Sequence, residues 1–122
     1  MALLGLMVGA FATTALLRAL QARQDPYPRA VMQVMQAHVD RLRANAGAGC
    51  DAATLRRDAT TLRTVATLVQ PAFPALAQDA PFAAYARKLE TATAPGIACA
   101  DAGERIAAIR QACADCHADY GH

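Results

Sequence analysis

The feature that most constrains this chain is a C-x-x-C-H motif formed by Cys113, Cys116 and His117, which ends five residues before the last one. In a helix, Cys113 and His117 lie one turn apart on one face and Cys116 lies beside them, so both thiols and the imidazole can reach one flat ligand. Each thiol of such a motif can add its S–H across a vinyl group of haem, while the imidazole ligates the iron. The motif therefore predicts one covalently attached haem c, with His117 as an iron ligand.

Two other uses of the same motif stay open from the residues alone, namely a dithiol redox pair and half of a zinc site. A redox C-x-x-C usually follows a strand in a β-α-β pattern, and a zinc site needs a second closely spaced pair of ligands. The remaining cysteines, Cys50 and Cys99, stand far apart in the sequence. Haem attachment is therefore the favoured interpretation, and a haem-free dithiol redox protein is the remote alternative.

Length and charge limit the class of protein further. A chain of 122 residues has room for one domain, whose own core would be marginal unless a cofactor adds to it. The 12 Lys and Arg residues against 10 Asp and Glu give a formal charge of +2 without a basic stripe, so we expect no nucleic-acid partner. Abundant alanine and only 5% aromatic residues favour closely packed helices over sheets.

Residues 1–22 are predicted to be a targeting segment, because an apolar run of about fifteen residues precedes the first polar stretch and is short for a membrane span. Cleavage would fall after Ala15, Ala19 or Ala22, and an uncleaved N-terminal membrane anchor is the alternative. In either case residues 23–122 would form the folded domain in an oxidising compartment, which predicts a periplasmic location.

Four helices are expected after residue 22. The first would begin with Asp25 as its N-cap and end at the glycines Gly47 and Gly49. The second would begin near Asp51 and be broken at Pro71. The apolar residues that recur at helical spacing along these two segments are Val31, Met32, Met35, Val39, Leu42, Leu55, Ala59, Leu62, Val65, Ala66 and Val69.

The third helix would begin at Asp79 with a proline in its first turn, bury Phe82, Tyr85, Ala86 and Leu89, and end near Pro95. The fourth would begin with a capping-box-like pair, Asp101 and Glu104, and would carry Ile106, Ile109 and the C-x-x-C-H motif on one face. Four amphipathic helices with short connections predict an all-α fold, an antiparallel up-and-down four-helix bundle.

This topology predicts which residues meet. The C-terminal end of the fourth helix would lie beside the start of the first, which brings Arg29, Met32 and Met35 near the motif. Almost no chain follows the motif, so a sixth iron ligand would have to come from upstream. Arg29 would neutralise a haem propionate, and Tyr120 would pack beside the porphyrin edge.

The segments "CADCHADY" at the end of the fourth helix and "VMQVMQAHVDRL" on the first resemble those of the cytochrome c′ family. The resemblance covers most of residues 25 to 120. It implies that Cys113, Cys116 and His117 hold the haem and that Met32 faces the iron. It also implies a six-coordinate, low-spin electron carrier, because family members with methionine at this position have that ligation, whereas members with a bulky apolar residue there bind gases.

The function expected from these observations is a periplasmic monohaem electron carrier that exchanges one electron with redox partner proteins and is not an enzyme. The alternative is a five-coordinate cytochrome that binds NO or CO, and ligation by Met35 in place of Met32 also stays open. The resemblance further suggests a homodimer through the first two helices. The bundle topology places Cys50 and Cys99 in loops at the end away from the haem, where they would form a disulfide.

Overall fold

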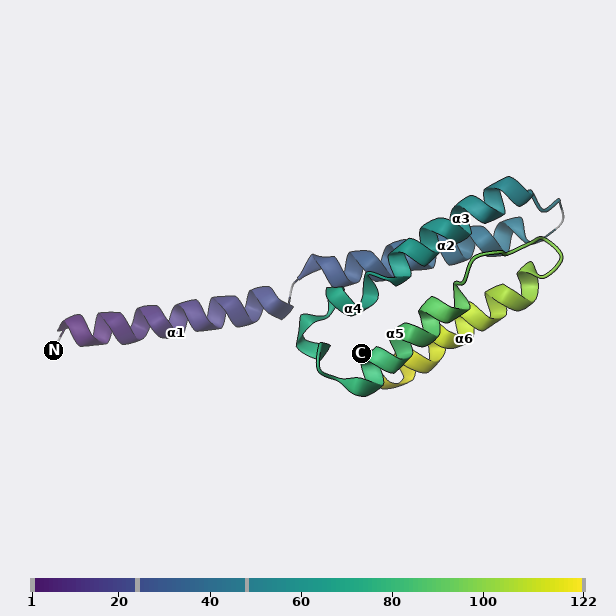
Figure 1. Cartoon of the computed structure of the whole chain (residues 1–122). Helices are drawn as coiled ribbons and strands as arrows, with labels where there is room; N and C mark the ends of the chain where they lie inside the picture. The colour runs from purple at the N-terminus through teal and green to yellow at the C-terminus, as the bar shows by residue number, and fades with distance from the viewer. Residues whose placement is uncertain (1, 24, 48, 122) are drawn as a thin grey trace.

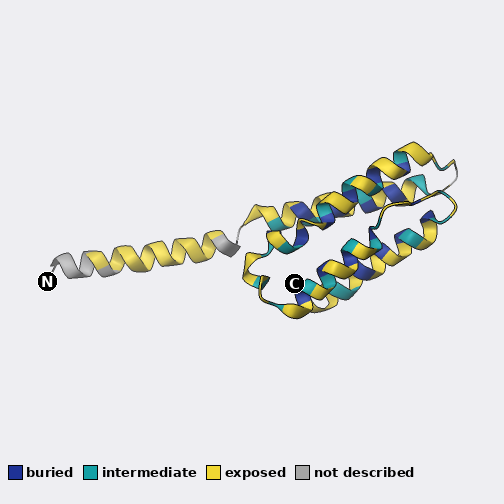
Figure 2. Cartoon of the chain, in the orientation of Figure 1, coloured by how far each residue is buried: buried dark blue, intermediate teal, exposed yellow. Residues whose placement is uncertain are grey.

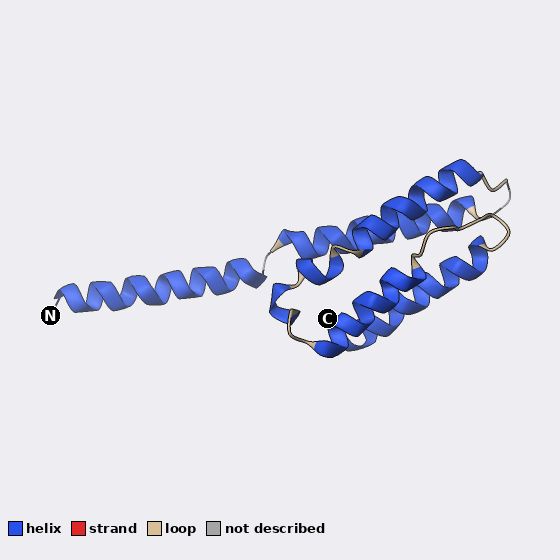
Figure 3. Ribbon diagram, in the orientation of Figure 1, coloured by secondary structure: helices blue, strands red, loops and turns tan. Residues whose placement is uncertain are grey.

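The chain folds as an all-α protein (Figure 3). The computed structural model describes residues 2–23, 25–47 and 49–121, and every regular element in these ranges is helical. This confirms the predicted fold class at the level of secondary structure. The elements are α1 (Ala2–Arg23), α2 (Pro26–Asn45), α3 (Ala52–Ala66), α4 (Val69–Ala72), the 3₁₀ turn η1 (Pro74–Leu76), α5 (Ala80–Ala92) and α6 (Ala102–Tyr120).

Helix α2 begins where local chemistry predicts. The Asp25 carboxylate accepts a hydrogen bond from the Tyr27 amide at 3.0 Å, and Pro26 occupies the first helical position, where no amide partner is needed. The helix ends at Asn45, two residues before Gly47. Its buried side chains are Val31, Met35, Val39 and Leu42, which confirms the predicted apolar face.

Helix α3 begins as predicted but ends earlier than Pro71. The Asp51 carboxylate caps it by accepting from the Thr54 amide at 2.9 Å. The helix ends at Ala66, because the last turn tightens and the Leu68 amide donates to the Val65 carbonyl, three residues back. The expectation that Pro71 breaks the helix was therefore wrong. Pro71 lies in the first turn of α4, where its missing N–H leaves no bond unmade.

Helices α5 and α6 differ in how their N-termini are capped. Asp79 caps α5 by accepting from the Phe82 amide at 3.0 Å, as expected. Asp101 precedes α6 but makes no capping bond, because its carboxylate turns back and accepts from the Ala98 amide at 2.9 Å. The predicted capping box of Asp101 and Glu104 was therefore wrong, and Asp101 stabilises the preceding loop instead.

The helices pack as two neighbouring pairs, α2 with α3 and α5 with α6, and further contacts join α2 to α6 and α3 to α5 (Figure 1). Their buried faces turn toward one another (Figure 2). The largest fully buried side chains are Leu42 on α2 and Leu55 and Leu62 on α3.

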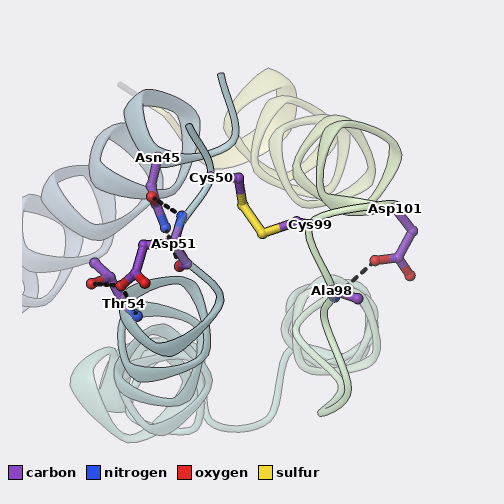
Figure 4. The surroundings of a disulfide bond; sticks show 7 residues. All are labelled: Asn45, Cys50, Asp51, Thr54, Ala98, Cys99 and Asp101. Atoms are coloured by element: carbon purple, nitrogen blue, oxygen red, sulfur yellow. Dashed lines mark hydrogen bonds between the residues drawn. A yellow bond between two sulfur atoms is a disulfide. The ribbon is translucent and has the colours of Figure 1, made fainter. Parts of the chain in front are cut away.

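A disulfide between Cys50 and Cys99 joins the loop after α2 to the loop before α6 (Figure 4). The prediction that these two cysteines pair is confirmed. The first of these loops is also held by the Asn45 side chain, which bonds both the amide and the carbonyl of Asp51. Both loops lie at the end of the molecule away from the C-terminus (Figure 1), so the disulfide connects the two helix pairs there.

Helix α1 projects away from the rest of the chain (Figure 1), and its described side chains are exposed. These include five large apolar residues, Met7, Phe11, Leu16, Leu17 and Leu20. Within the described residues, none of the helices has both the length and the apolar character that crossing a membrane requires.

Candidate functional site

The C-x-x-C-H motif lies in the last turns of α6, on the side that faces α2. Cys113 and Cys116 are half-buried and unpaired, and both pack against the core. The His117 side chain is exposed, and among the described residues no hydrogen bond or ion pair holds it. The motif therefore presents two partly sheltered thiols and an unengaged imidazole on one helix face.

A large cavity of about 380 Å³ opens beside the motif. Its lining is predominantly apolar, and it comes from α2, α5, α6 and the segment between α4 and α5. The residues that line it are Pro28, Arg29, Met32, Phe73, Leu76, Phe82, Cys116, His117, Tyr120 and Gly121.

A small cavity of about 30 Å³ adjoins the large one and lies deeper between the helices. Met32, Cys116 and His117 line both cavities, and Cys113 and Met35 line only the small one. The six residues that the sequence predicts for cofactor binding thus gather around two adjoining cavities. They are Arg29, Met32, Cys113, Cys116, His117 and Tyr120.

The two candidate methionines have different surroundings. Met32 is half-buried and borders the large cavity together with His117. Met35 is only 4% exposed and belongs to the hydrophobic core, one helical turn further along α2. A ligand in the large cavity would therefore meet the thioether of Met32 before that of Met35.

Aromatic residues form one wall of the site, and part of this wall was not predicted. The Tyr120 ring packs edge-on against Phe82, whose ring centre is 5.3 Å away, and Phe82 packs in the same way against Phe73 at 5.4 Å. Phe73 and Leu76 come from the segment that the sequence presents only as a Pro-rich break. Their apolar character next to prolines was the available signal, but it does not indicate which cavity they face.

Both motif thiols are held in their protonated form. Partial burial raises the pKa of Cys113, and the neighbouring charge of Cys116 raises it further. Burial also raises the pKa of Cys116, together with the carboxylate of Asp119. Reactive dithiols in redox proteins have lowered pKa values, which helix N-termini or nearby cations produce. These two cysteines, near the C-terminus of a helix, have the opposite environment.

Polar side chains attach the motif to α5. Lys88 forms an ion pair with Asp115, which lies between the two cysteines, and Gln111 also donates to Asp115 at 2.8 Å. These contacts lower the pKa of Asp115, so its carboxylate stays ionised. The Tyr85 hydroxyl donates to Asp119 two residues after His117. The part of α6 that carries the motif is thus fixed to α5, which also contributes Tyr85 and Leu89 to the wall of the small cavity.

In the described part of the chain, no group of three or more His, Cys, Asp and Glu side chains is arranged to hold a metal ion by itself. No protein-family profile, curated protein or solved structure matches this chain.

Proposed function

We propose that this chain is a c-type cytochrome built on an antiparallel up-and-down four-helix bundle of α2, α3, α5 and α6, and that it carries single electrons. One observation carries the proposal. Met32 from α2 and the thiols and imidazole of the C-x-x-C-H motif from α6 border the same adjoining cavities. A bundle that holds a cofactor between facing helices has this arrangement.

The lining of the large cavity fits a haem. Its volume of about 380 Å³ falls in the range of roughly 300 to 1,000 Å³ typical of cofactor sites, and its walls are mostly apolar. Cys116 from this cavity and Cys113 from the adjoining small one would supply two thiols for thioether bonds, and His117 would supply an imidazole for the iron. When bound, haem c would supply the Fe(III)/Fe(II) couple.

The other lining residues have separate roles in this proposal. The Arg29 guanidinium, at the rim of the cavity, would pair with a propionate carboxylate. Met32 would be the second protein ligand of the iron, since this half-buried residue borders the large cavity and Met35 does not. Phe73, Phe82 and Tyr120 would exclude water from one side, and a drier environment would shift the redox potential.

The raised pKa values of Cys113 and Cys116 favour this function over a haem-free dithiol redox protein, because nucleophilic exchange requires a thiolate. The Cys50–Cys99 disulfide supports an exported protein, since such bonds persist in oxidising compartments. In this proposal residues 1–22 serve as the export signal or as an N-terminal anchor.

The test is a visible spectrum of the full chain produced in a bacterial periplasm together with haem-attachment machinery. We expect a red protein whose colour remains with the polypeptide in acidified acetone and whose spectrum is that of low-spin iron. The matched control is the double variant Cys113→Ser/Cys116→Ser, which should lose its colour under the same extraction. A high-spin five-coordinate spectrum would favour NO or CO binding, and a colourless helical protein would contradict the whole proposal.

A further inference from the structure

A single carboxylate oxygen joins the end of α6 to the start of α5. The Tyr120 hydroxyl, on the last residue of α6, donates to Asp79 Oδ1 at 2.8 Å. The same oxygen accepts from the Phe82 amide at 3.0 Å, which is the capping bond of α5. The terminal turn of α6 is therefore attached to the N-cap residue of α5.

Aromatic packing directs the Tyr120 hydroxyl toward this oxygen. The ring of Tyr120 meets Phe82 edge-on at a centre-to-centre distance of 5.3 Å and Tyr85 at 6.0 Å. Such edge-on pairs stabilise one ring orientation beyond the burial of apolar area. The hydrogen bond to Asp79, together with partial burial, raises the pKa of Tyr120 to about 12, so the hydroxyl remains a donor at neutral pH.

Gly121, the residue after Tyr120, closes the last helical turn over His117. The Gly121 amide donates to the His117 carbonyl at 3.0 Å and ends the helix. A Cβ at position 121 would lie 2.6 Å from the His117 carbonyl oxygen and 2.9 Å from its Cα, so only glycine fits without moving His117. The backbone of His117 is thus in direct contact with the segment that Tyr120 attaches to α5.

His117 needs such support because it lies in the last turn of a helix, where backbone bonds run out and chains fray. Among the described residues, nothing bonds its imidazole, so the position of this side chain depends on its backbone. An axial ligand must keep its place within about 0.5 Å to bind well.

We propose that Tyr120, through its hydrogen bond to Asp79, is the positioning residue that holds His117 in place as an iron ligand. This inference rests on the proposed function, because it concerns the role of His117 toward the haem. The hydroxyl and the carboxylate act beside the Tyr85–Asp119 bond, which joins the same turn of α6 to α5. Tyr120 thereby acts on the iron ligand from outside the C-x-x-C-H motif.

The test uses the full-length protein and two variants that leave the rest of the contact intact. Tyr120→Phe keeps the ring packing and removes only the hydroxyl. Asp79→Ser keeps a capping oxygen for the Phe82 amide but is too short to reach Tyr120. Tyr27→Phe is the matched control, since Tyr27 is exposed and its side chain borders neither cavity.

Two measurements distinguish a role of Tyr120 in positioning His117 from a general effect on the stability of the fold. The first is hydrogen exchange of the Gly121 amide, which should accelerate about fivefold in Tyr120→Phe and in Asp79→Ser. About fivefold is the change in an opening equilibrium that the loss of one ordinary hydrogen bond produces. The second is the pH at which acid displaces the histidine ligand, read from the visible spectrum. This midpoint should rise by about 0.7 pH unit, because a proton displaces a more weakly held histidine at higher pH. A shift of about 0.7 pH unit corresponds to the same factor of five. The double variant should shift no further than either single variant.

The outcomes distinguish this inference from the proposed function. Unchanged exchange at Gly121 would overturn the attachment of the last turn, and faster exchange with an unchanged acid midpoint would overturn its positioning role. A shift of equal size in Tyr27→Phe would also overturn it. A colourless wild-type protein would contradict the proposed function itself and, with it, any role of His117 as a ligand.

Discussion

Met32 and His117 border the same two cavities, although Met32 lies on α2 and His117 on α6, far apart in the sequence. Contacts between α2 and α6 bring the two residues to the same end of the molecule. A thioether and an imidazole on facing helices form the ligand pair that raises the potential of a c-type haem. This juxtaposition is the structural basis for expecting an electron carrier.

Replacing Met32 should therefore change the ligation and spin state of the iron and leave the fold intact. In Met32→Leu we expect loss of the low-spin spectrum and ready binding of CO, because leucine fills a similar volume without offering a ligand. Visible spectra of both oxidation states, with and without CO, measure the effect. Met35→Leu is the control and should keep the low-spin spectrum, since Met35 borders only the small cavity. A spectral change confined to Met35→Leu would reverse the assignment.

Removing the disulfide should weaken the fold without changing haem attachment. Cys50 and Cys99 close a loop with a sequence separation of 49, which is worth roughly 4 kcal/mol by the loop-entropy estimate. Urea unfolding of Cys50→Ser/Cys99→Ser should show most of this loss. A reductant should lower the stability of the wild type and leave that of the variant unchanged. Two reactive thiols in unfolded, unreduced wild-type protein with its haem attached would contradict the pairing.

The core between α2 and α3 should be sensitive to truncation. Leu62 is fully buried, so Leu62→Ala should cost about 2 to 5 kcal/mol of the free energy of unfolding. Leu68, which is 38% exposed a few residues later, is the matched control and should cost far less. Denaturant unfolding measures both variants. Equal losses would mean that the packing of α3 differs from the one described.

Stability should fall at alkaline pH through Tyr120. Its pKa is raised to about 12 in the folded protein, against an ordinary value of 10.0. Between these values the unfolded chain has lost a proton that the folded chain still holds, so the stabilisation is complete below pH 10 and disappears as pH rises toward 12. The difference in urea midpoint between the wild type and Tyr120→Phe, followed from pH 9 upward, should shrink. A constant difference would argue against the Asp79 contact.

The ends of the helices could mostly be predicted from the sequence, because they depend on neighbouring residues. Asp25, Asp51 and Asp79 each cap a helix by reaching an amide two or three residues ahead. Asp101 is the exception, because it precedes a helix without capping it. Its sequence pattern resembles a cap, yet the loop around Ala98 competes successfully for its carboxylate.

Helical spacing also predicted the inward faces, but not every residue on them. Asp58 is 6% exposed on the buried face of α3, where its carboxylate lies 3.4 Å from His38 Nδ1 on α2. Both residues are polar, so an apolar pattern does not reveal them. Their contact depends on how α2 and α3 pack against each other. The same holds for Phe73 and Leu76, which face the large cavity only after the chain turns past α4.

The sequence by itself determined the chemistry of this protein: helices with their caps, two thiols and an imidazole at one spacing, and two more cysteines at loop positions. Only the tertiary structure decided which side chains share a cavity. Met32 rather than Met35 borders the large cavity with His117, and Tyr120 reaches Asp79. Local spacing specifies the face of one helix, whereas the distance between two faces depends on the packing of all the helices together.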